Sequence, residues 1–243
     1  MGIGRGYLAP RVVLAATIVF VLLLGIRTHW LPYQPGGLPD SAHPVPGEMF
    51  TGLDNGERYL RDGFRYWLLE NLPDAEGKAK LYTHNVNING PIQLVLRLAG
   101  VNSHVPLALI NAIAFFAGIW FGYLAVLRAS RDEHIALLFL FFLATNYYFN
   151  LLFAFNLRAW HWLGLFGTLL CTLLMSGDDA ERRHGQIWIF PATFIAFSCA
   201  YDFAAEVGCA ALAIAALYRS ARAAVMVVLG FAVAFALRHL QVT

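Results

Sequence analysis

Seven apolar runs, each long enough to cross or nearly cross the hydrocarbon layer of a membrane, dominate the sequence. A transmembrane helix needs about 20 predominantly apolar residues, because its backbone is hydrogen-bonded internally while its side chains face lipid. Hydrophobic residues make up 59% of the chain and charged residues 13%, against about half and about a quarter in soluble domains. We therefore expect an all-α membrane protein of about seven transmembrane helices, at residues 12–31, 105–127, 135–155, 159–175, 187–200, 203–218 and 223–237.

Two of these assignments leave alternatives. The first run follows Arg5 and Arg11 and lacks an A-x-A-like cleavage site, so a signal peptide is the alternative to the uncleaved signal-anchor that we expect. The fifth and sixth runs are short and meet at Tyr201-Asp202. They form either two spans or a helical hairpin that is tilted or stops short of the far surface.

Arginines mark every second connection between the runs. The positive-inside rule places Lys and Arg in short cytoplasmic loops. Together with Arg5 and Arg11, these arginines predict a cytoplasmic N-terminus and an outer C-terminus. The chain then divides into a first transmembrane helix at 1–31, a long non-cytoplasmic loop at 32–104 and a bundle of about six further transmembrane helices at 105–243. The marking arginines are Arg128, Arg131, Arg182, Arg183, Arg219 and Arg222.

The expected outer loop carries one amphipathic segment. Residues 55–71 place Tyr59, Phe64 and Trp67 at helical spacing, opposite charged residues such as Arg58. This pattern predicts a helix that lies on the membrane surface or against the bundle. A Pro- and Gly-rich stretch at 31–40 precedes it and disfavours regular structure there.

Composition and motifs argue against several function classes. The net charge of +2 and the lack of Lys/Arg-rich tracts indicate that nucleic acid is not a partner. Cys171, Cys199 and Cys209 stand alone in apolar runs, which is typical of small core residues. No zinc signature, P-loop, dinucleotide fingerprint or Ser-His-Asp pattern can be read in the sequence, so we predict neither a metal nor a cofactor.

Four ionisable residues fall near the outer ends of two runs. Such groups are costly at membrane depth and are candidates for function. Asp202 and Glu206 are four residues apart and share one face of the sixth run, while Arg158 and His161 stand at the start of the fourth. Their common side favours one site next to the outer loop. The alternative is structural, with Arg158 pairing with Asp202 or Glu206 to hold the helices together.

The segment Tyr82-Thr-His-Asn85 closes the outer loop with side chains that donate and accept hydrogen bonds. The order of one membrane helix, an outer loop with a surface helix, and this segment resembles the N-terminal module of the GT-C class of membrane glycosyltransferases. Members of that class often carry a tyrosine-threonine-histidine-like segment followed by proline at this place. Tyr201-Asp-Phe203, between two runs, belongs to the same likeness.

The resemblance implies transfer of a sugar from a polyprenyl-phosphate donor at the outer face of the membrane, which points to a bacterial inner membrane. It also implies a carboxylate base in the outer loop. For this base Glu48 is the first candidate, Asp54 the second and Asp40 the third. Together with the polar groups at the outer ends of the runs, it suggests seven substrate-binding residues: Tyr82, His84, Asn85, Arg158, His161, Asp202 and Glu206.

A second function class stays open. The Asp-Glu pair that GT-C enzymes often carry after the first span is absent, and aromatic residues make up 14% of a short chain. These features favour a non-catalytic scaffold or an accessory subunit that binds other membrane proteins. A transporter or channel would need a polar path through the bilayer, whereas the polar groups here gather at one end.

Overall fold

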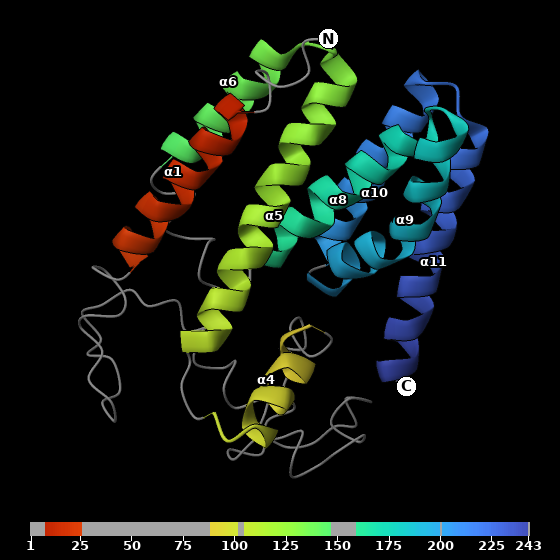
Figure 1. Cartoon of the computed structure of the whole chain (residues 1–243). Helices are drawn as coiled ribbons and strands as arrows, with labels where there is room; N and C mark the ends of the chain where they lie inside the picture. The colour runs from red at the N-terminus through yellow and green to blue at the C-terminus, as the bar shows by residue number, and fades with distance from the viewer. Residues whose placement is uncertain (1–7, 26–87, 102–104, 147–158, 200, 243) are drawn as a thin grey trace.

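The protein is described by a computed structural model at residues 8–25, 88–101, 105–146, 159–199 and 201–242. All regular elements within these ranges are α-helices, which confirms the predicted all-α class for them. The helices are α1 (Leu8–Gly25), α4 (Asn89–Leu98), α5 (Val105–Ser130), α6 (Glu133–Thr145), α8 (Ala159–Met175), α9 (Asp179–Cys199), α10 (Tyr201–Leu217) and α11 (Ala221–Val242) (Figure 1). All of them except α4 overlap the predicted apolar runs. The predicted surface helix at 55–71 lies outside the described residues.

One described helical stretch, Leu109–Ser130 in α5, is long and apolar enough to cross a membrane by length and composition. Five further apolar helical stretches are shorter, between 10 and 17 residues. The described part of the chain therefore contains a helix for each of the seven predicted spans, of which one meets the length and hydropathy of a span on its own.

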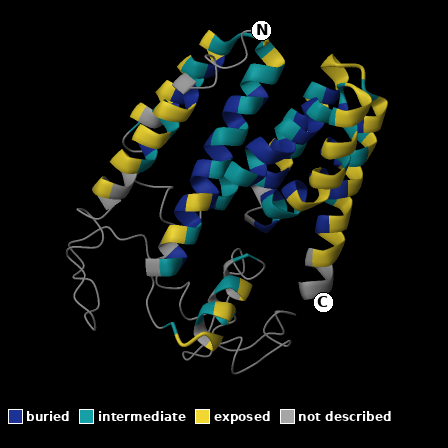
Figure 2. Ribbon diagram, in the orientation of Figure 1, coloured by how far each residue is buried: buried dark blue, intermediate teal, exposed yellow. Residues whose placement is uncertain are grey.

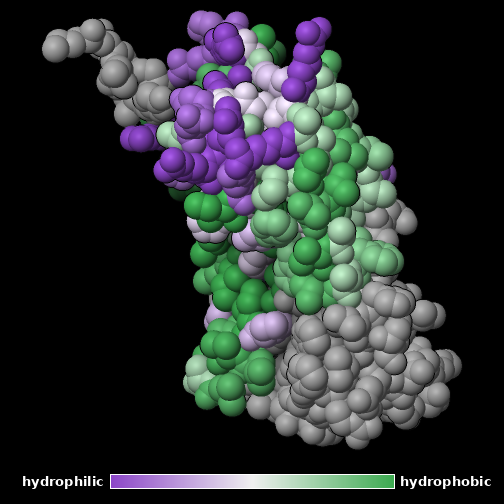
Figure 3. Space-filling view, turned by 90° about the vertical axis from the view of Figure 1, so that its right-hand side faces the viewer, coloured by the Kyte–Doolittle hydropathy of each residue, from purple (hydrophilic) through white to green (hydrophobic). Residues whose placement is uncertain are grey.

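Successive helices of the bundle alternate in direction. The connections from α5 to α6, from α8 to α9 and from α10 to α11 all lie at the same end of the molecule, at the top of Figure 1. Because these connections carry Arg128, Arg131, Arg182, Arg219 and Arg222, we call it the arginine end. Hydrophilic residues gather there above a largely apolar flank in Figure 3.

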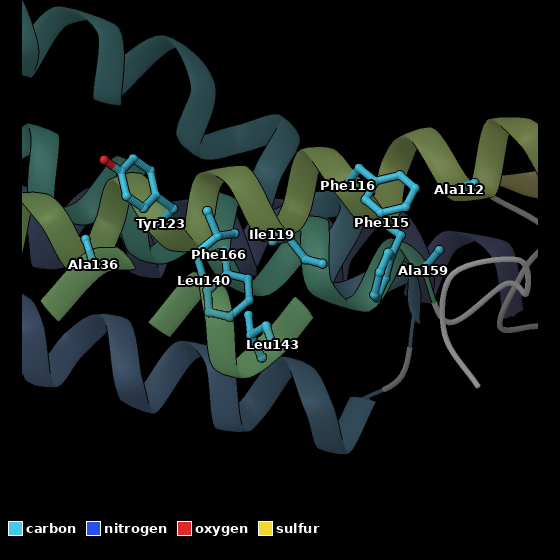
Figure 4. Close-up of a cluster of buried hydrophobic side chains, with 10 residues drawn as sticks. All are labelled: Ala112, Phe115, Phe116, Ile119, Tyr123, Ala136, Leu140, Leu143, Ala159 and Phe166. Atoms are coloured by element: carbon cyan, nitrogen blue, oxygen red, sulfur yellow. The ribbon is translucent and has the colours of Figure 1, made fainter. Parts of the chain in front are cut away.

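A first hydrophobic cluster surrounds α5. Phe115 and Ile119 of α5 are fully buried, and they pack with Leu140 of α6 and Phe166 of α8 (Figure 4). The ring of Phe139 on α6 meets the ring of Phe166 edge-on, with the ring centroids 5.6 Å apart. This cluster joins α5, α6 and α8 into one body.

A second cluster lies among the four C-terminal helices. Met175 of α8, Ile189 of α9 and Val227 of α11 are buried in it together with alanines of α10. Since α8 packs against α5 on one side and against α9, α10 and α11 on the other, it is the central helix of the bundle.

Two glycines let the backbones of three helices approach closely. A Cβ added at Gly118 of α5 would lie 2.7 Å from the backbone of Leu163 on α8. A Cβ added at Gly164 of α8 would lie 2.7 Å from the backbone of Ala196 on α9. Glycine is required at both positions because any side chain would push two helices apart, and small residues at helix contacts are a common packing device in membrane bundles.

The C-terminus of α4 ends in a glycine turn. Gly100 has a φ of +75°, and the amide of Val101 donates to the carbonyl of Leu96 at 2.9 Å. This is the Schellman arrangement, in which a residue in the left-handed region lets the chain leave the helix while its last carbonyls stay hydrogen-bonded.

Two arginines hold the same left-handed position at the arginine end. Arg131, with φ 56°, donates its amide to the carbonyl of Leu127 at 2.9 Å and ends α5. Arg219, with φ 51°, ends α10, where the amide of Ser220 donates to the carbonyl of Ala215 at 2.8 Å. Left-handed backbone costs a non-glycine residue roughly 1–2 kcal/mol. Both cations stand beside helix C-termini, where positive charge is favourable.

Two of the largest differences from the predicted helix boundaries are at the end of α6 and at the start of α9. α6 ends at Thr145, with Asn146 as its cap, and the rest of that predicted run lies outside the described residues. α9 begins at Asp179 instead of Ile187, because the carboxylate of Asp178 accepts hydrogen bonds from the amides of Ala180 and Glu181 at 3.0 and 2.9 Å. The charged residues interrupt the apolar run without interrupting the helix, since acidic groups stabilise a helix start.

Candidate functional site

Two contacts between helices lie at the end of the bundle opposite the arginine end, one between Asn111 and Trp160 and one between His161 and Phe203. We call this end the tryptophan end and define it by these four residues. Asn111 belongs to the second turn of α5, Trp160 and His161 to the first turn of α8, and Phe203 to the first turn of α10. These turns meet because α8 packs against both α5 and α10.

Asn111 and Trp160 form a hydrogen bond between helices. Asn111 is 1% exposed, and its side-chain oxygen accepts from Trp160 Nε1 at 2.9 Å. A buried amide is costly without partners, and the bond therefore favours one register of α8 against α5. It also fixes the position of the indole ring at the start of α8.

His161 and Phe203 bring the starts of α8 and α10 side by side. Their ring centroids are 4.8 Å apart, with an interplanar angle of 58°. Asp202 belongs to the same first turn of α10 as Phe203, and the exposed Glu206 follows one turn later. His161 therefore lies beside the first turn of α10, while a joint site of His161 with Asp202 and Glu206 stays a prediction.

Seven predicted site residues lie outside the described residues, and so do the contacts that would link them to the tryptophan end. They include all three candidate bases and the hydrogen-bonding segment that closes the outer loop. Arg158 directly precedes Ala159, the first residue of α8, so its predicted pairing with Asp202 or Glu206 also falls outside what the structure describes. The seven are Asp40, Glu48, Asp54, Tyr82, His84, Asn85 and Arg158.

Asn111 was not singled out by the sequence analysis. Its signal is a lone amide in the otherwise apolar start of the second run, where a hydrogen-bonding side chain has no local partner and must look to another helix. Trp160, at the start of the fourth run, supplies the partner in this register. The pair could have been proposed only with the helix order in hand.

Two buried hydroxyls in the middle of the bundle are hydrogen-bonded within their own helices, whereas the buried hydroxyl of Thr168 has no hydrogen-bond partner among the described residues. Thr172 donates to the carbonyl of Thr168, and Thr193 donates to that of Ile189, each at 2.8 Å. Among the described residues the buried polar side chains are Thr17, Asn111, Thr168, Thr172, Thr193 and Ser198, and none of these is a carboxylic acid, a histidine or a base. Within this part of the chain there is also no group of three His, Cys, Asp or Glu residues suited to a metal.

The arginine end contains an ion pair that joins two helices. Arg128 of α5 donates to the carboxylate of Glu181 on α9 at 2.5 Å, with about a third of each side chain exposed. Arg182 instead donates to Asp179 and to the carbonyl of Gly177. Glu181, in the first turn of α9, is therefore held against the C-terminal end of α5 by Arg128.

The chain was compared with protein-family models, with curated proteins and with solved structures, and none of the three comparisons found a match.

Proposed function

We propose that the chain is a multi-pass integral membrane protein whose tryptophan end forms the outer site of a GT-C-like glycosyltransferase. The observation that carries the membrane part is the distribution of exposed apolar side chains. Ile113 of α5 is 68% exposed, Phe142 of α6 is 66% exposed and Ile187 of α9 is 66% exposed. Further exposed apolar residues lie on α1, α10 and α11, and Figure 2 shows exposed residues along the outer flanks of the helices.

Water does not suit such a surface. A soluble monomer rarely exposes contiguous apolar patches larger than a few hundred Å². Here the exposed apolar side chains lie on outward faces of several helices, and charged residues gather at the arginine end. Lipid around the flanks and water at the arginine end satisfy both sets of residues. The short helices then cross with tilt or with local thinning of the bilayer.

The orientation follows from the arginines. The positive-inside rule puts the arginine end in the cytoplasm and the tryptophan end at the opposite interface. Trp160 and Trp162 fit that interface, because indole rings favour the headgroup level of a bilayer. In this orientation the N-terminus is cytoplasmic and the loop at 32–104 is outside.

A polyprenyl-phosphate sugar suits the tryptophan end. Its tail stays in lipid beside the exposed apolar flanks while its phosphate and sugar reach the interface. Arg158 would bind the phosphate, and the aromatic rings around His161 would border the sugar. A carboxylate, with Glu48 as the first candidate, would take the proton of an acceptor hydroxyl as the new glycosidic bond forms and the bond from sugar to phosphate breaks. Polyprenyl phosphate then leaves.

The second candidate is a non-catalytic subunit of a larger membrane complex. The specific observation in its favour is the outward face of α6, where Leu138, Phe141 and Phe142 are more than half exposed. Large aromatic side chains are enriched where helices of different subunits meet. A partner would then cover α6 instead of lipid.

Transfer of a labelled sugar from a polyprenyl-phosphate donor by the purified chain tests the two candidates. We expect binding of the donor, and its loss in Arg158→Met and His161→Ala variants that keep their elution volume in detergent. Glu48→Gln should bind the donor and fail to transfer the sugar. If the unmutated chain binds none of the donors and elutes with a stoichiometric membrane partner, the accessory role replaces the transferase.

Orientation is tested separately with single cysteines in a background that lacks the native ones. The cysteines are placed at Ala129, Ala180 and Ala221, which are exposed at the arginine end. Ser130 is left unchanged because its hydroxyl donates to the carbonyl of Val126. We expect each to resist an impermeant thiol reagent in intact cells and to react after lysis. Labelling in intact cells would reverse the orientation and place the tryptophan end in the cytoplasm.

A further inference from the structure

α4 carries an exposed apolar stripe along one face. Pro91, Val95 and Leu98 recur at the spacing that puts residues on the same side of a helix. All three are exposed, Val95 by 65% and Leu98 by 71%. Exposure of three neighbouring apolar residues to water is unfavourable, so we expect lipid or protein to cover the stripe.

The helix is amphipathic in a particular proportion. Asn89, Gln93 and Arg97 follow one another at intervals of four and occupy register positions away from the stripe. The apolar positions cover the wider arc of the helix and the polar positions a narrow one. A wide apolar arc with a narrow polar arc is typical of helices that lie in the plane of a membrane interface.

Length and position decide between crossing the bilayer and lying on it. Ten residues extend about 15 Å, which is half of the roughly 30 Å of hydrocarbon in a bilayer. α4 ends at Leu98, and α5 begins at Val105, so only a short connection separates α4 from the helix that meets the criteria for a span. Figure 1 places α4 near the start of α5, away from the arginine end.

The turn after α4 supports a change of direction at this point. Gly100, in the left-handed conformation, ends the helix, and Val101 is tied back to Leu96. On α5 itself, exposed apolar residues begin again at Leu109 and Ile113. Exposed apolar side chains therefore occur both before this turn, on α4, and after it, on the part of α5 that we assign to lipid.

We infer that α4 is an interfacial helix whose partner is the bilayer surface. Its stripe of Pro91, Val95 and Leu98 enters the boundary between headgroups and acyl chains, to a depth of about 5–10 Å. This inference rests on the proposed membrane location and adds an attachment site that a bundle of spans does not require. In the proposed orientation α4 anchors the end of the loop at 32–104 to the outer leaflet.

Fluorescence quenching of the full chain in bilayers tests this directly. The polarity-sensitive label NBD is attached to single cysteines at Val95, Gln93 and Ile113, in a background that lacks the native cysteines. The protein is reconstituted in phosphatidylcholine vesicles that contain spin-labelled lipids with the quencher either near the headgroup or near the acyl end. Iodide in the buffer reports exposure to water.

We expect the label at Val95 to be quenched several-fold more by the shallow spin label than by the deep one, and to be protected from iodide. The label at Gln93 should be the more accessible of the two to iodide. Equal access of iodide to Val95 and Gln93 would overturn the inference, as would protection of Val95 from iodide and lipid alike, which would mean a protein cover. Stronger quenching of Val95 by the deep label would make α4 part of a span.

The label at Ile113 distinguishes a failure of the inference about α4 from a failure of the proposed membrane location. It should be quenched by the lipid-borne labels whether or not α4 lies at the interface. If Ile113 is quenched and Val95 is not, the inference about α4 fails and the membrane location stands. If Ile113 is reached by iodide and by no lipid label, the proposed membrane location itself fails, and the inference fails with it.

Discussion

The indole nitrogen of Trp160 donates a hydrogen bond to the buried side-chain oxygen of Asn111 at 2.9 Å, and so links the first turn of α8 to the second turn of α5. We expect Asn111→Leu to cost about 1–3 kcal/mol of unfolding free energy, because the indole N–H loses its acceptor in a buried place. Trp160→Phe should also destabilise the protein, because the buried side-chain oxygen of Asn111 then loses its indole donor.

A double-mutant cycle measures the bond itself. The double variant should be less destabilised than the sum of the two single variants, by roughly 0.6–1.7 kcal/mol if the bond contributes as much as hydrogen bonds between membrane helices do. Unfolding in mixed micelles provides the free energies, and Trp188→Phe, on the exposed side of α9, is the matched tryptophan control. Strict additivity of the two changes would mean that the bond contributes nothing.

Gly164 and Gly167 on α8 provide a matched pair of substitutions. A Cβ at Gly164 would collide with the backbone of Ala196, whereas a Cβ at Gly167 would make an ordinary contact at 3.4 Å with the Cβ of Ala192. We expect Gly164→Ala to destabilise the protein by about 1–3 kcal/mol through overpacking. Gly167→Ala should be neutral or stabilising by up to about 1 kcal/mol, because alanine favours helix. Thermal unfolding in detergent measures both changes. A Gly164→Ala variant that is more stable than Gly167→Ala would contradict the prediction.

The ion pair between Arg128 and Glu181 should contribute modestly. Because about a third of each side chain is exposed, we expect Glu181→Gln to cost about 1 kcal/mol or less, and less still at high ionic strength. Asp179→Asn is the control, since the Asp179 side chain is 88% exposed and stands in the same first turn of α9. Equal effects of the two variants, or an effect indifferent to salt, would show that the pair does not join α9 to α5.

The left-handed positions predict opposite responses to similar changes. Arg219→Gly should stabilise the protein by about 1 kcal/mol in detergent, since glycine adopts positive φ without the steric cost that arginine bears. Gly100→Ala should destabilise the end of α4, because alanine bears a steric cost at positive φ. A Cβ at Gly100 meets no other atom within 4 Å, so a clash with neighbouring residues does not contribute. Arg219→Ala, which keeps the steric cost, serves as the control.

The charge of Arg219 has a separate readout. If the residue is held there for orientation, Arg219→Gly combined with Arg222→Ala should increase labelling of a cysteine at Ala221 in intact cells, although the single change stabilises the fold. If the protein becomes more stable and the labelling is unchanged, the charge of Arg219 does not help to set the orientation.

Much of the helix inventory could be predicted from the sequence, because apolar runs report where a backbone must satisfy its own hydrogen bonds. The starts of α5 and α8 agree with the predicted runs, and the arginine connections fall at one end because successive helices reverse direction. Helix ends were less predictable. Asp178 begins a helix inside a charged segment, which hydropathy alone cannot detect.

Pairings between helices could not be predicted at all. The bond from Trp160 to Asn111 depends on the register of α8 against α5 and on the close approach of the two backbones at Gly118. Sequence patterns report which face of a helix is apolar and say nothing of which residue lies opposite. The proximity of His161 to Phe203 was predicted only as a shared end of two helices, and the distance between their rings comes from the structure.

The position of α8 at the centre of the bundle has a consequence for biosynthesis. α8 supplies Ala159 and Phe166 to the cluster around α5, and Cys171 and Met175 to the cluster of the last four helices. A chain is synthesised from its N-terminus, so α5 and α6 leave the ribosome before the side chains that complete their own cluster exist. Until α8 arrives, the face of α5 around Gly118 lacks its partner. The nascent protein therefore reaches its compact form late, and ribosome-bound chains truncated before Ala159 should be the species that cellular quality-control proteases recognise and remove.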